Sequence, residues 1–335
     1  MSIVTQKINP NPRLTKHLVG LGFFRSNPVT VIDIGSRGGF EKQWGVYGDQ
    51  VRIIGFEPDA VECEKLNKSA DPTTIHYPVA LSKSKGRQKF YIAEHLAASG
   101  FYRPYERYLS RLPEMANRKI KDIVMMDTID LDTFLLEKKI PIVDFVKIDT
   151  EGSEMDIVLG AQSTFKNSVL GISLESMFNR QREGEPLFSE ADLALRSLGF
   201  ELYDLPVFRS ARRVLSPHMF SDNAGPTDNG QVTWTQAIYF RDGFDEVRFC
   251  NLVASWDVVR ILKLASLLEV FNFEDCALEL VDLCRPKLLK SSLDPQKLVN
   301  MLVPPVNGNF MSWDEYRDYV KTEGPPRYVD GRRVK

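Results

Sequence analysis

The chain has 335 residues, 43% of them hydrophobic, and its 43 basic and 45 acidic side chains give a net charge of −2. This length allows one large core with an appendage, and the charge excludes a general attraction to nucleic acid or anionic membranes. No segment reaches the roughly 18 apolar residues of a membrane span, and the N-terminus has no apolar signal core. The four cysteines form no C-x-x-C pair, which indicates reduced thiols in a cytoplasmic protein: Cys63, Cys250, Cys276 and Cys284.

The first chemical signal follows an N-terminal helical segment, residues 1–28, with a short helix expected over 13–21. Val29–Ile34 is a β-branched, apolar run that suits a strand buried on both faces. An acid near its end, Asp33, is followed by a glycine turn, where small residues let a ligand approach the backbone. We expect this turn at the carboxyl edge of an open α/β sheet, where such sheets bind ligands.

A second strand is expected over residues 51–58, and it also ends in an acid, Glu57, before Pro58. Glu57 follows Asp33 by 24 positions, close to the distance at which nucleotide-binding folds place an acid on ribose hydroxyls. The glycines read G-x-x-G-G and not G-x-G-x-x-G, so the pyrophosphate fingerprint of a dinucleotide is missing. The pattern therefore favours an adenosine ligand without phosphates, of which S-adenosylmethionine is the common one.

A third buried strand, residues 142–149, is followed by TEGSE. The succession VIDIGSRGGF, GFEPDA, VALSKSKG, TIDLDTFL and DFVKIDTEGSEMDIVLGA, then a strand ending in Glu, resembles the FkbM family of S-adenosylmethionine-dependent methyltransferases. The resemblance covers roughly residues 28–205, with a last strand near 235–241. It implies a class I methyltransferase (Rossmann-like) α/β fold, with a seven-stranded, mostly parallel sheet and helices on both faces. It also implies O-methylation, usually of a sugar, a glycan or a natural-product hydroxyl.

The resemblance also suggests how the cofactor is held. Asp33 and the glycine turn would hold its amino-acid part, Glu57 its ribose, and backbone atoms of Ala80 its adenine. Ser99 would contact the cofactor, because the family has a Ser-rich turn in this region; the alternative is a surface excursion stabilised by Tyr and Arg packing. The family often has an Asn in the first glycine loop where this chain has Ser36 and Arg37. The predicted cofactor residues are Asp33, Gly35, Ser36, Gly38, Gly39, Glu57, Pro58, Ala80 and Ser99.

Three acids are the catalytic candidates: Asp149, Glu151 and Glu175. A carboxylate there would act as a general base or orient the acceptor hydroxyl, and clustered like charges raise the pKa of at least one of them. Two alternatives stay open for individual acids. Glu151 could instead cap the N-terminus of the helix expected over 151–161. Asp149 could take a divalent metal, but no second acidic cluster supports a ligand shell, so no metal is predicted.

Acceptor contacts are expected from the loop 177–188 and from a long connection, residues 206–233, interpreted as a lid. The predicted acceptor residues are Asn179, Arg180, Arg209 and His218. The connection contains three arginines, Arg209, Arg212 and Arg213. They indicate either an anionic acceptor or ordinary charged residues exposed to solvent. His218 is either an alternative base or an unrelated loop residue.

The remaining pattern divides the chain into segments 1–28, 29–242 and 243–335. In the middle segment we expect helices over 40–47, 59–69, 130–137, 151–161 and 189–198, and strands over 74–79, 87–93, 121–128, 170–176, 200–205 and 234–241. The last segment is helical, with amphipathic helices over 255–270 and 273–283 and a capping-box helix after Ser312. It would cover the acceptor pocket, form a homodimer interface or bind a partner enzyme.

Two competing hypotheses come from other functional classes. An NAD-dependent sugar oxidoreductase would need a G-x-G-x-x-G turn and a Tyr-x-x-x-Lys pair, and the sequence offers neither near the expected strands. A non-catalytic assembly module would use the helical tail as its working surface, although the intact Asp33 and Glu57 argue for cofactor binding. We therefore expect a cytoplasmic S-adenosylmethionine-dependent O-methyltransferase with a small-molecule or glycan acceptor.

Overall fold

The computed structural model describes residues 8–113, 118–214, 230–242, 252–325, 327–329 and 332–334. The chain divides into two compact units, each of which is described by itself. The larger consists of residues 1–5, 29–42 and 51–242, and the smaller of residues 6–28, 43–50 and 243–335. Within these described ranges, every helix is too short or too polar to span a bilayer.

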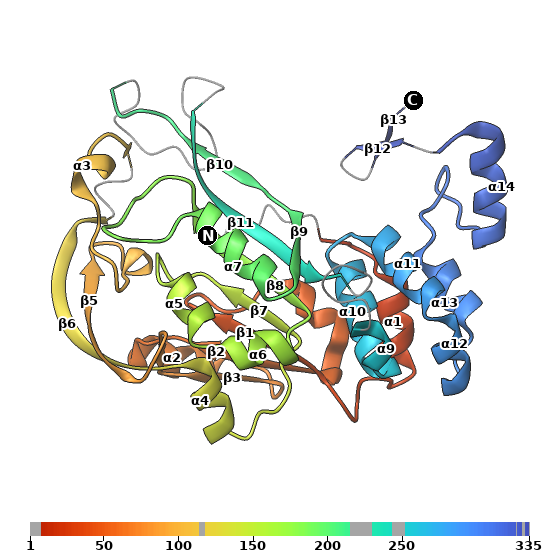
Figure 1. Cartoon of the computed structure of the whole chain (residues 1–335), viewed down its shortest axis with the longest axis horizontal. Coiled ribbons are helices and arrows are strands. Elements are labelled where there is room, and N and C mark those ends of the chain that lie inside the picture. The colour runs from red at the N-terminus through yellow and green to blue at the C-terminus, as the bar shows by residue number, and fades with distance from the viewer. Residues whose placement is uncertain are drawn as a thin grey trace. The chain divides into compact units, whose positions relative to one another are not determined.

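The larger unit is built on an eight-stranded sheet in the order β10-β11-β8-β7-β1-β2-β3, with β9 also paired to β11 (Figure 1). The five strands β8, β7, β1, β2 and β3 pair with one another in parallel. In contrast, β11 is antiparallel to β8, β9 and β10. The strand order reverses between β1 and β7, and this switch point is where open α/β sheets bind ligands. The strands are β1 (Val29–Ile34), β2 (Val51–Phe56), β3 (Thr74–Tyr77), β7 (Phe145–Ile148), β8 (Gly171–Met177), β9 (Phe200–Asp204), β10 (Val207–Ser210) and β11 (Gln231–Arg241).

This arrangement confirms the predicted α/β class I methyltransferase fold with one difference. The eighth strand, β10, lies in the connection over 206–233 that we expected to be a loop. It pairs with the start of β11, where the Phe208 and Trp234 rings stack with centroids 3.7 Å apart and planes 5° apart. Aromatic cross-strand pairs stabilise a sheet, and this one outweighs the loop-like composition around it.

Helices α4 (Leu131–Glu137), α5 (Glu154–Leu159), α6 (Gln162–Asn167) and α7 (Phe188–Ser197) contribute to the core of this unit. Their apolar side chains form one buried cluster with alternate residues of the central strands. The sheet's share of this cluster is Ile32, Ile34, Ile54, Phe56, Val146, Ile148, Ile172 and Leu174. Burying each such side chain stabilises the fold by roughly 1.5–3 kcal/mol, so this face of the sheet fixes the strand ends that carry the site.

Several predicted helix boundaries were wrong for local reasons. The helix after β7 begins at Glu154 and not at Glu151, because Glu151 and Gly152 have φ angles of +59° and +110°. α7 is capped by Glu190, which accepts from the Leu187 N–H at 2.8 Å, and not by Ser189. The stretch expected as a helix over 40–47 is instead a 3₁₀ segment, η1 (Lys42–Gln50), with non-helical backbone at Gly48. In contrast, α2 (Ala60–Lys68) starts as predicted after Asp59, whose carboxylate accepts from the Val61 N–H at 3.0 Å.

A second, three-stranded sheet in the larger unit has the order β4-β6-β5, with β4 (Ala80–Leu81), β5 (Gly86–Ala93) and β6 (Ile120–Ile129). Figure 1 shows it at one end of the main sheet, where η2 (Leu96–Ala98) and α3 (Glu106–Leu109) follow β5. The strands predicted over 87–93 and 121–128 therefore exist, but they lie outside the main sheet.

The smaller unit is helical. It contains α1 (Arg13–Gly20), α9 (Leu252–Ser255), α10 (Val258–Val270), α11 (Glu274–Leu283), α12 (Arg285–Leu288), η4 (Leu289–Ser291), α13 (Pro295–Leu302), α14 (Trp313–Glu323) and a short hairpin of β12 (Arg327–Val329) and β13 (Arg332–Val334). The buried carboxylate of Glu269 accepts from the N–H groups of Leu14 and Thr15 at 2.8 and 2.7 Å, which fixes the start of α1 to α10. The capping box predicted at Ser312 is confirmed, since Ser312 and Glu315 bond each other's backbone N–H.

Candidate active site

The glycine turn after β1 lies close against the end of β7. A Cβ on Gly35, which has φ +87°, would lie 1.9 Å from the carbonyl oxygen of Asp149. The Gly35 N–H in turn donates to the carbonyl of Phe56 at 3.0 Å. Gly38 and Gly39 also have positive φ angles, +89° and +90°, but a Cβ on either would have no heavy atom within 4 Å. The turn is thus closely packed at its start and open at its end, where a ligand can approach the backbone.

An ion pair joins β1 and β7 at the switch point. Lys147 lies opposite Asp33 in the register, with its Nζ 3.3 Å from the Oδ1 of Asp33 and 3.4 Å from the Oδ2 of Asp149. Burial raises the pKa of Asp33, and the Lys147 charge opposes that rise. Burial lowers the pKa of Lys147, but the carboxylates of Asp33 and Asp149 outweigh it, so the net shift is upward. Two of the predicted site acids therefore share one cation that the sequence analysis did not assign.

At the end of β2, the predicted ribose ligand Glu57 is buried. Its Oε1 accepts from the Asp59 N–H at 2.9 Å and lies 3.4 Å from Nη2 of Arg37. The same nitrogen lies 2.9 Å from Oδ2 of Asp59, so Arg37 connects the glycine turn to the second strand end. Burial raises the pKa of Glu57. The next residue, Pro58, is half-buried.

Ser36 also contacts a neighbouring strand. Its Oγ lies 3.0 Å from Nδ1 of the buried His76, whose ring stacks on Phe40 with centroids 4.7 Å apart. Burial lowers the pKa of His76, which favours the neutral imidazole. A Cβ at Gly55 would lie 2.3 Å from Nδ1 of His76, so the glycine in β2 makes room for this ring.

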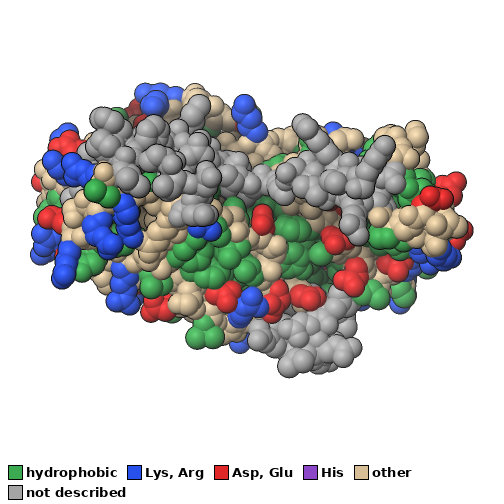
Figure 2. Space-filling view, turned by 90° about the horizontal axis from the view of Figure 1, so that it is seen from above, with side chains coloured by type: hydrophobic (Ala, Val, Ile, Leu, Met, Phe, Trp, Pro, Cys, Tyr) green, Lys and Arg blue, Asp and Glu red, His purple; other side chains and the backbone are tan. Residues whose placement is uncertain are grey.

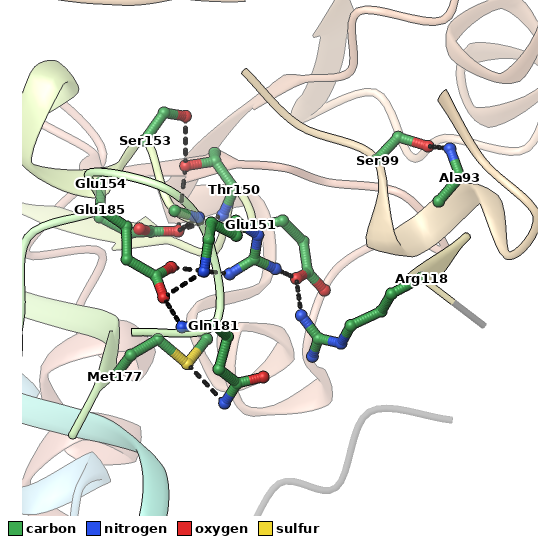
Figure 3. Close-up of polar contacts among 12 residues, drawn as sticks. Ala93, Ser99, Arg118, Thr150, Glu151, Ser153, Glu154, Met177, Gln181 and Glu185 are labelled. Atoms are coloured by element: carbon green, nitrogen blue, oxygen red, sulfur yellow. Dashed lines mark hydrogen bonds and ion pairs between the residues drawn. The ribbon is translucent and has the colours of Figure 1, made fainter. Parts of the chain in front are cut away.

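Ala80 and Ser99 lie in the second sheet and its connection. Ala80 is buried in β4, three residues after β3 ends, and pairs with Thr128. Ser99 accepts from the Ala93 N–H at 3.0 Å through its Oγ (Figure 3). The following residue, Gly100, packs against the turn after β7, since a Cβ there would lie 2.8 Å from the carbonyl oxygen of Glu151. Ser99 is thereby placed beside the turn that carries two predicted acids.

The turn after β7 is organised by a buried carboxylate, Glu154. Its Oε1 accepts from the N–H groups of Thr150 and Gly152 at 2.9 and 3.0 Å (Figure 3). Burial raises the pKa of Glu154 to about 7. Among the described residues α5 has no side-chain cap, so Glu151 does not have the capping role that we considered for it. Glu154 instead stabilises the turn before the helix, a role that sequence reasoning did not assign.

Glu151 is neutralised by arginines from two other segments. Its Oε2 is 3.3 Å from Nη1 of Arg118 and also contacts Nη2 of Arg182, which is paired with Glu185 at 3.1 Å. Burial lowers the pKa of Arg182 to about 10. Figure 3 shows Glu151 and Glu185 on the loops that follow β7 and β8, with Arg118 reaching Glu151 from the segment before β6. The sequence pointed to Arg180, which is exposed, and nothing in its spacing distinguishes Arg180 from the buried Arg182.

The third predicted acid has a different environment. Glu175, near the carboxyl end of β8, is 8% exposed, and within the described ranges its Oε2 has no hydrogen-bond partner. Burial raises the pKa of Glu175 well above its usual value, and the charges on Asp149 and Glu154 raise it further. A buried carboxylate oxygen without a partner is costly, so it marks a place where a ligand donor would be stabilised.

The acceptor-side residues lie at the same edge of the sheet. Asn179 donates to the carbonyl of Val232 and accepts from Gln231 Nε2 at 3.0 Å. Arg209 donates to the carbonyl of Gly230 at 3.0 Å. His218 lies outside the described residues.

The site as a whole is acidic. Around the ends of β1, β7 and β8, the described residues place six carboxylates among three cations, which suits a positively charged or hydroxyl-bearing ligand better than an anion. The carboxylates are Asp33, Asp149, Glu151, Glu154, Glu175 and Glu185, and the cations are Arg118, Lys147 and Arg182. The described part of the chain contains no cluster of three or more His, Cys, Asp or Glu side chains that could hold a metal.

Comparison with known proteins gives one family. Residues 39–202 match the family model described as the methyltransferase FkbM domain. No curated protein sequence matches the chain.

Among solved structures, magnesium protoporphyrin IX methyltransferase from Synechocystis, with S-adenosylmethionine bound, is 8% identical over 69% of this chain and 80% of its own, with a TM-score of 0.30. TrmK from M. capricolum, in complex with S-adenosylhomocysteine, is 9% identical over 88% of this chain and 96% of its own, with a TM-score of 0.33. The 1,6-didemethyltoxoflavin-N1-methyltransferase from Burkholderia thailandensis is 8% identical over 70% and 79%, with a TM-score of 0.32. At such scores these similarities carry no argument about this chain.

Proposed function

The chain is an S-adenosylmethionine-dependent methyltransferase with an FkbM domain over residues 39–202, and we propose that it methylates a hydroxyl oxygen of a sugar, a glycan or a related metabolite. When bound, S-adenosylmethionine supplies an electrophilic methyl group on a positively charged sulfur. The task left to the protein is to hold that donor, to bring a hydroxyl in line with the methyl group, and to receive the hydroxyl proton.

The residues at the ends of β1 and β2 fit the cofactor. The open end of the glycine turn, at Gly38 and Gly39, leaves room beside the backbone, and the Asp33 carboxylate suits the amino group of the methionine part. In this proposal the buried Glu57 would accept from ribose hydroxyls, next to Pro58, and Ser36 would complete the turn. Ala80 remains our candidate for a backbone contact to adenine, and Ser99 remains a candidate for a further contact to the cofactor. No metal ion is part of this proposal.

One observation carries the assignment of the base: the buried, unpartnered Oε2 of Glu175. An acceptor hydroxyl that donates to this oxygen would satisfy it and at the same time be oriented for attack. A general base of this kind contributes roughly 10²–10⁴-fold to the rate. Because its pKa is raised, the Glu175 carboxylate is a stronger base than an ordinary carboxylate and is better matched to a proton transfer near neutral pH.

The other two acids take supporting roles in this proposal. Asp149, paired with Lys147, borders the cofactor and helps to orient the acceptor. Glu151, paired with Arg118 and Arg182, holds the acceptor-side loops. Asn179, Arg180 and Arg209 lie at the outer part of the same edge, where they would contact the rest of the acceptor.

The remaining parts of the proposal concern the setting of the enzyme. The described cysteines are free thiols, which supports a cytoplasmic location. We assign residues 29–242 to cofactor binding and catalysis. The C-terminal residues 243–335 would serve a homodimer or a partner enzyme.

The test is methyl transfer from radiolabelled S-adenosylmethionine to a panel of free sugars, nucleotide-activated sugars and glycan oligomers. We expect transfer to a hydroxyl of one acceptor class. Glu175→Gln should lower the turnover rate about 10²–10⁴-fold, while calorimetry shows unchanged S-adenosylhomocysteine binding.

The matched control is Glu183→Gln, which alters an exposed acid on the loop after β8. It should keep full activity. A Glu175→Gln enzyme as active as Glu183→Gln would contradict the assignment of the base, and labelling only of nitrogen or carbon would contradict O-methylation.

A further inference from the structure

Five arginines gather beyond the acidic site, and we call them the arginine rim: Arg107, Arg111, Arg180, Arg212 and Arg213. They come from three separate segments, namely α3 with the turn after it, the loop after β8, and the stretch after β10. All are exposed except Arg212, which is half-buried. Figure 2 shows basic side chains concentrated at the end of the larger unit that carries α3, β5 and β6.

The topology brings these segments to one edge. β11 is antiparallel to β8 and β10 is antiparallel to β11, so β10 ends on the same side of the sheet as β8. A chain of side chains connects them: Arg212 donates to Gln231, and Gln231 donates to Asn179 at 3.0 Å. The segment after β10 is tied to that after α3, because the Arg213 N–H donates to the Arg111 carbonyl at 2.9 Å.

The residues just before α3 are tied to the loop after β8. The Tyr105 N–H donates to the Gln181 carbonyl at 2.8 Å, and the Glu183 N–H donates to the Arg103 carbonyl at 2.8 Å. The rim therefore continues the same loop that carries Arg182 and Glu185 of the acidic site.

The rim arginines are not held in ion pairs as the inner cations are, although Glu106, which pairs with Arg103 at 4.0 Å, and the exposed Glu183 lie on the same segments. Within the part of the chain that the structure describes, none of the five arginines forms an ion pair. The guanidinium carbons of Arg111 and Arg212 lie 6.0 and 5.9 Å from the centre of the same Tyr108 ring. Among the described residues, Nη1 of Arg212 is buried without a hydrogen-bond partner. Clustered cations and an unpaired buried donor are unfavourable until an anion is bound.

We propose that the arginine rim binds a phosphate or diphosphate group of the acceptor, so that the acceptor is a phosphorylated or diphosphate-activated sugar. Arginine suits this ligand because its planar guanidinium donates two parallel hydrogen bonds to phosphate oxygens. The division of charge sets the orientation: the anionic group stays on the rim, and the neutral hydroxyl reaches the acidic site at Glu175. This inference rests on the proposed function, since it names the acceptor class for that same site.

The test is calorimetric titration of the full chain with inorganic pyrophosphate and with UDP-glucose, at low and at moderate ionic strength. We expect saturable binding of both probes that weakens with salt. Arg111→Gln and Arg212→Gln should each weaken it about tenfold, as expected for one hydrogen bond to a charged group. The matched control is Arg52→Gln, an exposed arginine near the amino end of β2, which should bind both probes as the wild type does.

S-Adenosylhomocysteine binding by each variant, measured in the same series, shows whether the fold and the cofactor site are intact. Tighter binding of UDP-glucose than of pyrophosphate would indicate a nucleotide-activated acceptor, and equal binding would indicate that the diphosphate alone is recognised, as in a lipid-linked sugar. Absence of saturable binding in a wild-type protein that binds S-adenosylhomocysteine would overturn the rim proposal and leave the methyltransferase assignment standing. Equal weakening by Arg52→Gln would also overturn it.

Discussion

Two neighbouring strand ends, those of β7 and β8, place acids in opposite situations. After β7, Asp149 has Lys147 as a partner and Glu151 has Arg118 and Arg182. Near the end of β8, Glu175 is buried and its Oε2 has no hydrogen-bond partner within the described residues.

This difference suggests separate functions for the acids at the two strand ends. A carboxylate held by fixed cations keeps its charge and its position, which suits the packing of a turn or the binding of a cofactor. Glu175 feels the charge of Arg118, but burial and the neighbouring carboxylates outweigh it and raise its pKa. Its Oε2 is therefore satisfied only when a donor reaches it. This difference supports our proposal that Glu175 on β8 accepts the proton and that the acids after β7 support the cofactor and the loops.

We expect the largest loss of stability from Gly35→Ala, which would disrupt the close approach of the turn after β1 to the end of β7. The new Cβ would meet the Asp149 carbonyl oxygen 1.9 Å away, at a φ of +87°. Because backbone atoms cannot yield cheaply, we expect the free energy of unfolding to fall by more than about 4 kcal/mol. S-Adenosylhomocysteine binding should be lost with it. Urea denaturation and calorimetry measure both quantities.

The control for that substitution is Gly38→Ala, where φ is also positive but no heavy atom lies within 4 Å of the new Cβ. It should cost only the left-handed backbone penalty of about 1–2 kcal/mol. Equal losses in the two variants would show that the contact with Asp149 is not what requires glycine.

Glu151→Gln should lower stability more than turnover, unlike a substitution of Glu175. It leaves the guanidinium groups of Arg182 and Arg118 with less compensation, and breaking a buried pair costs about 3–5 kcal/mol. We expect that loss in the free energy of unfolding, with less than a tenfold loss of turnover below the unfolding transition. Glu175→Gln should show the reverse pattern: little loss of stability and a large loss of turnover. A catalytic loss as large in Glu151→Gln would assign the base to β7.

The pH dependence of stability tests the environment of the turn after β7. The pKa of Glu154 is raised to about 7 by burial, so between its ordinary range and pH 7 the folded state binds more protons than the unfolded state. Stability contributed by this group is therefore present at low pH and lost as the pH rises through about 7, by up to about 1.4 kcal/mol per pH unit.

Urea denaturation at pH 5, 6, 7 and 8 measures this slope. Glu154→Gln keeps an acceptor oxygen for the Thr150 and Gly152 N–H groups and should flatten it. Glu190→Gln offers a control with an acid that caps α7. A slope unchanged by Glu154→Gln would show that another group titrates.

The smallest effect is expected from Arg37→Ala. Arg37 pairs with Glu57 and Asp59, but its side chain is 26% exposed, and such pairs contribute about 0–1 kcal/mol. Removing it should change S-adenosylhomocysteine affinity less than about fivefold, by calorimetry. A larger loss would mean that Arg37 positions the Glu57 carboxylate for the ribose.

Sequence reasoning reached the fold because the signals for β1, β2, β7 and β8 are local: apolar β-branched runs that end in acids or glycine. It located the strand-end acids for the same reason. It could not find Lys147 or Arg182 as partners, because pairing depends on the register between strands and on loops distant in sequence. A lysine inside the buried run VKI is a signal that could have been used.

The start of α5 and the presence of strand β10 depend on contacts between residues that a local sequence pattern does not reveal. β10 formed because Phe208 stacks on Trp234, 26 positions later in the chain. The start of α5 moved because Glu151 adopts a left-handed backbone conformation in the turn that Glu154 stabilises. In both places tertiary contacts decided between structures that the local sequence permits.

The most direct test of the account is calorimetric titration of S-adenosylhomocysteine into the wild type, Glu57→Gln and Glu175→Gln. We expect micromolar binding by the wild type, binding at least about tenfold weaker in Glu57→Gln through loss of a charged hydrogen-bond acceptor, and wild-type binding in Glu175→Gln. Cofactor binding that survives in Glu57→Gln and disappears in Glu175→Gln would contradict the division between cofactor and acceptor acids.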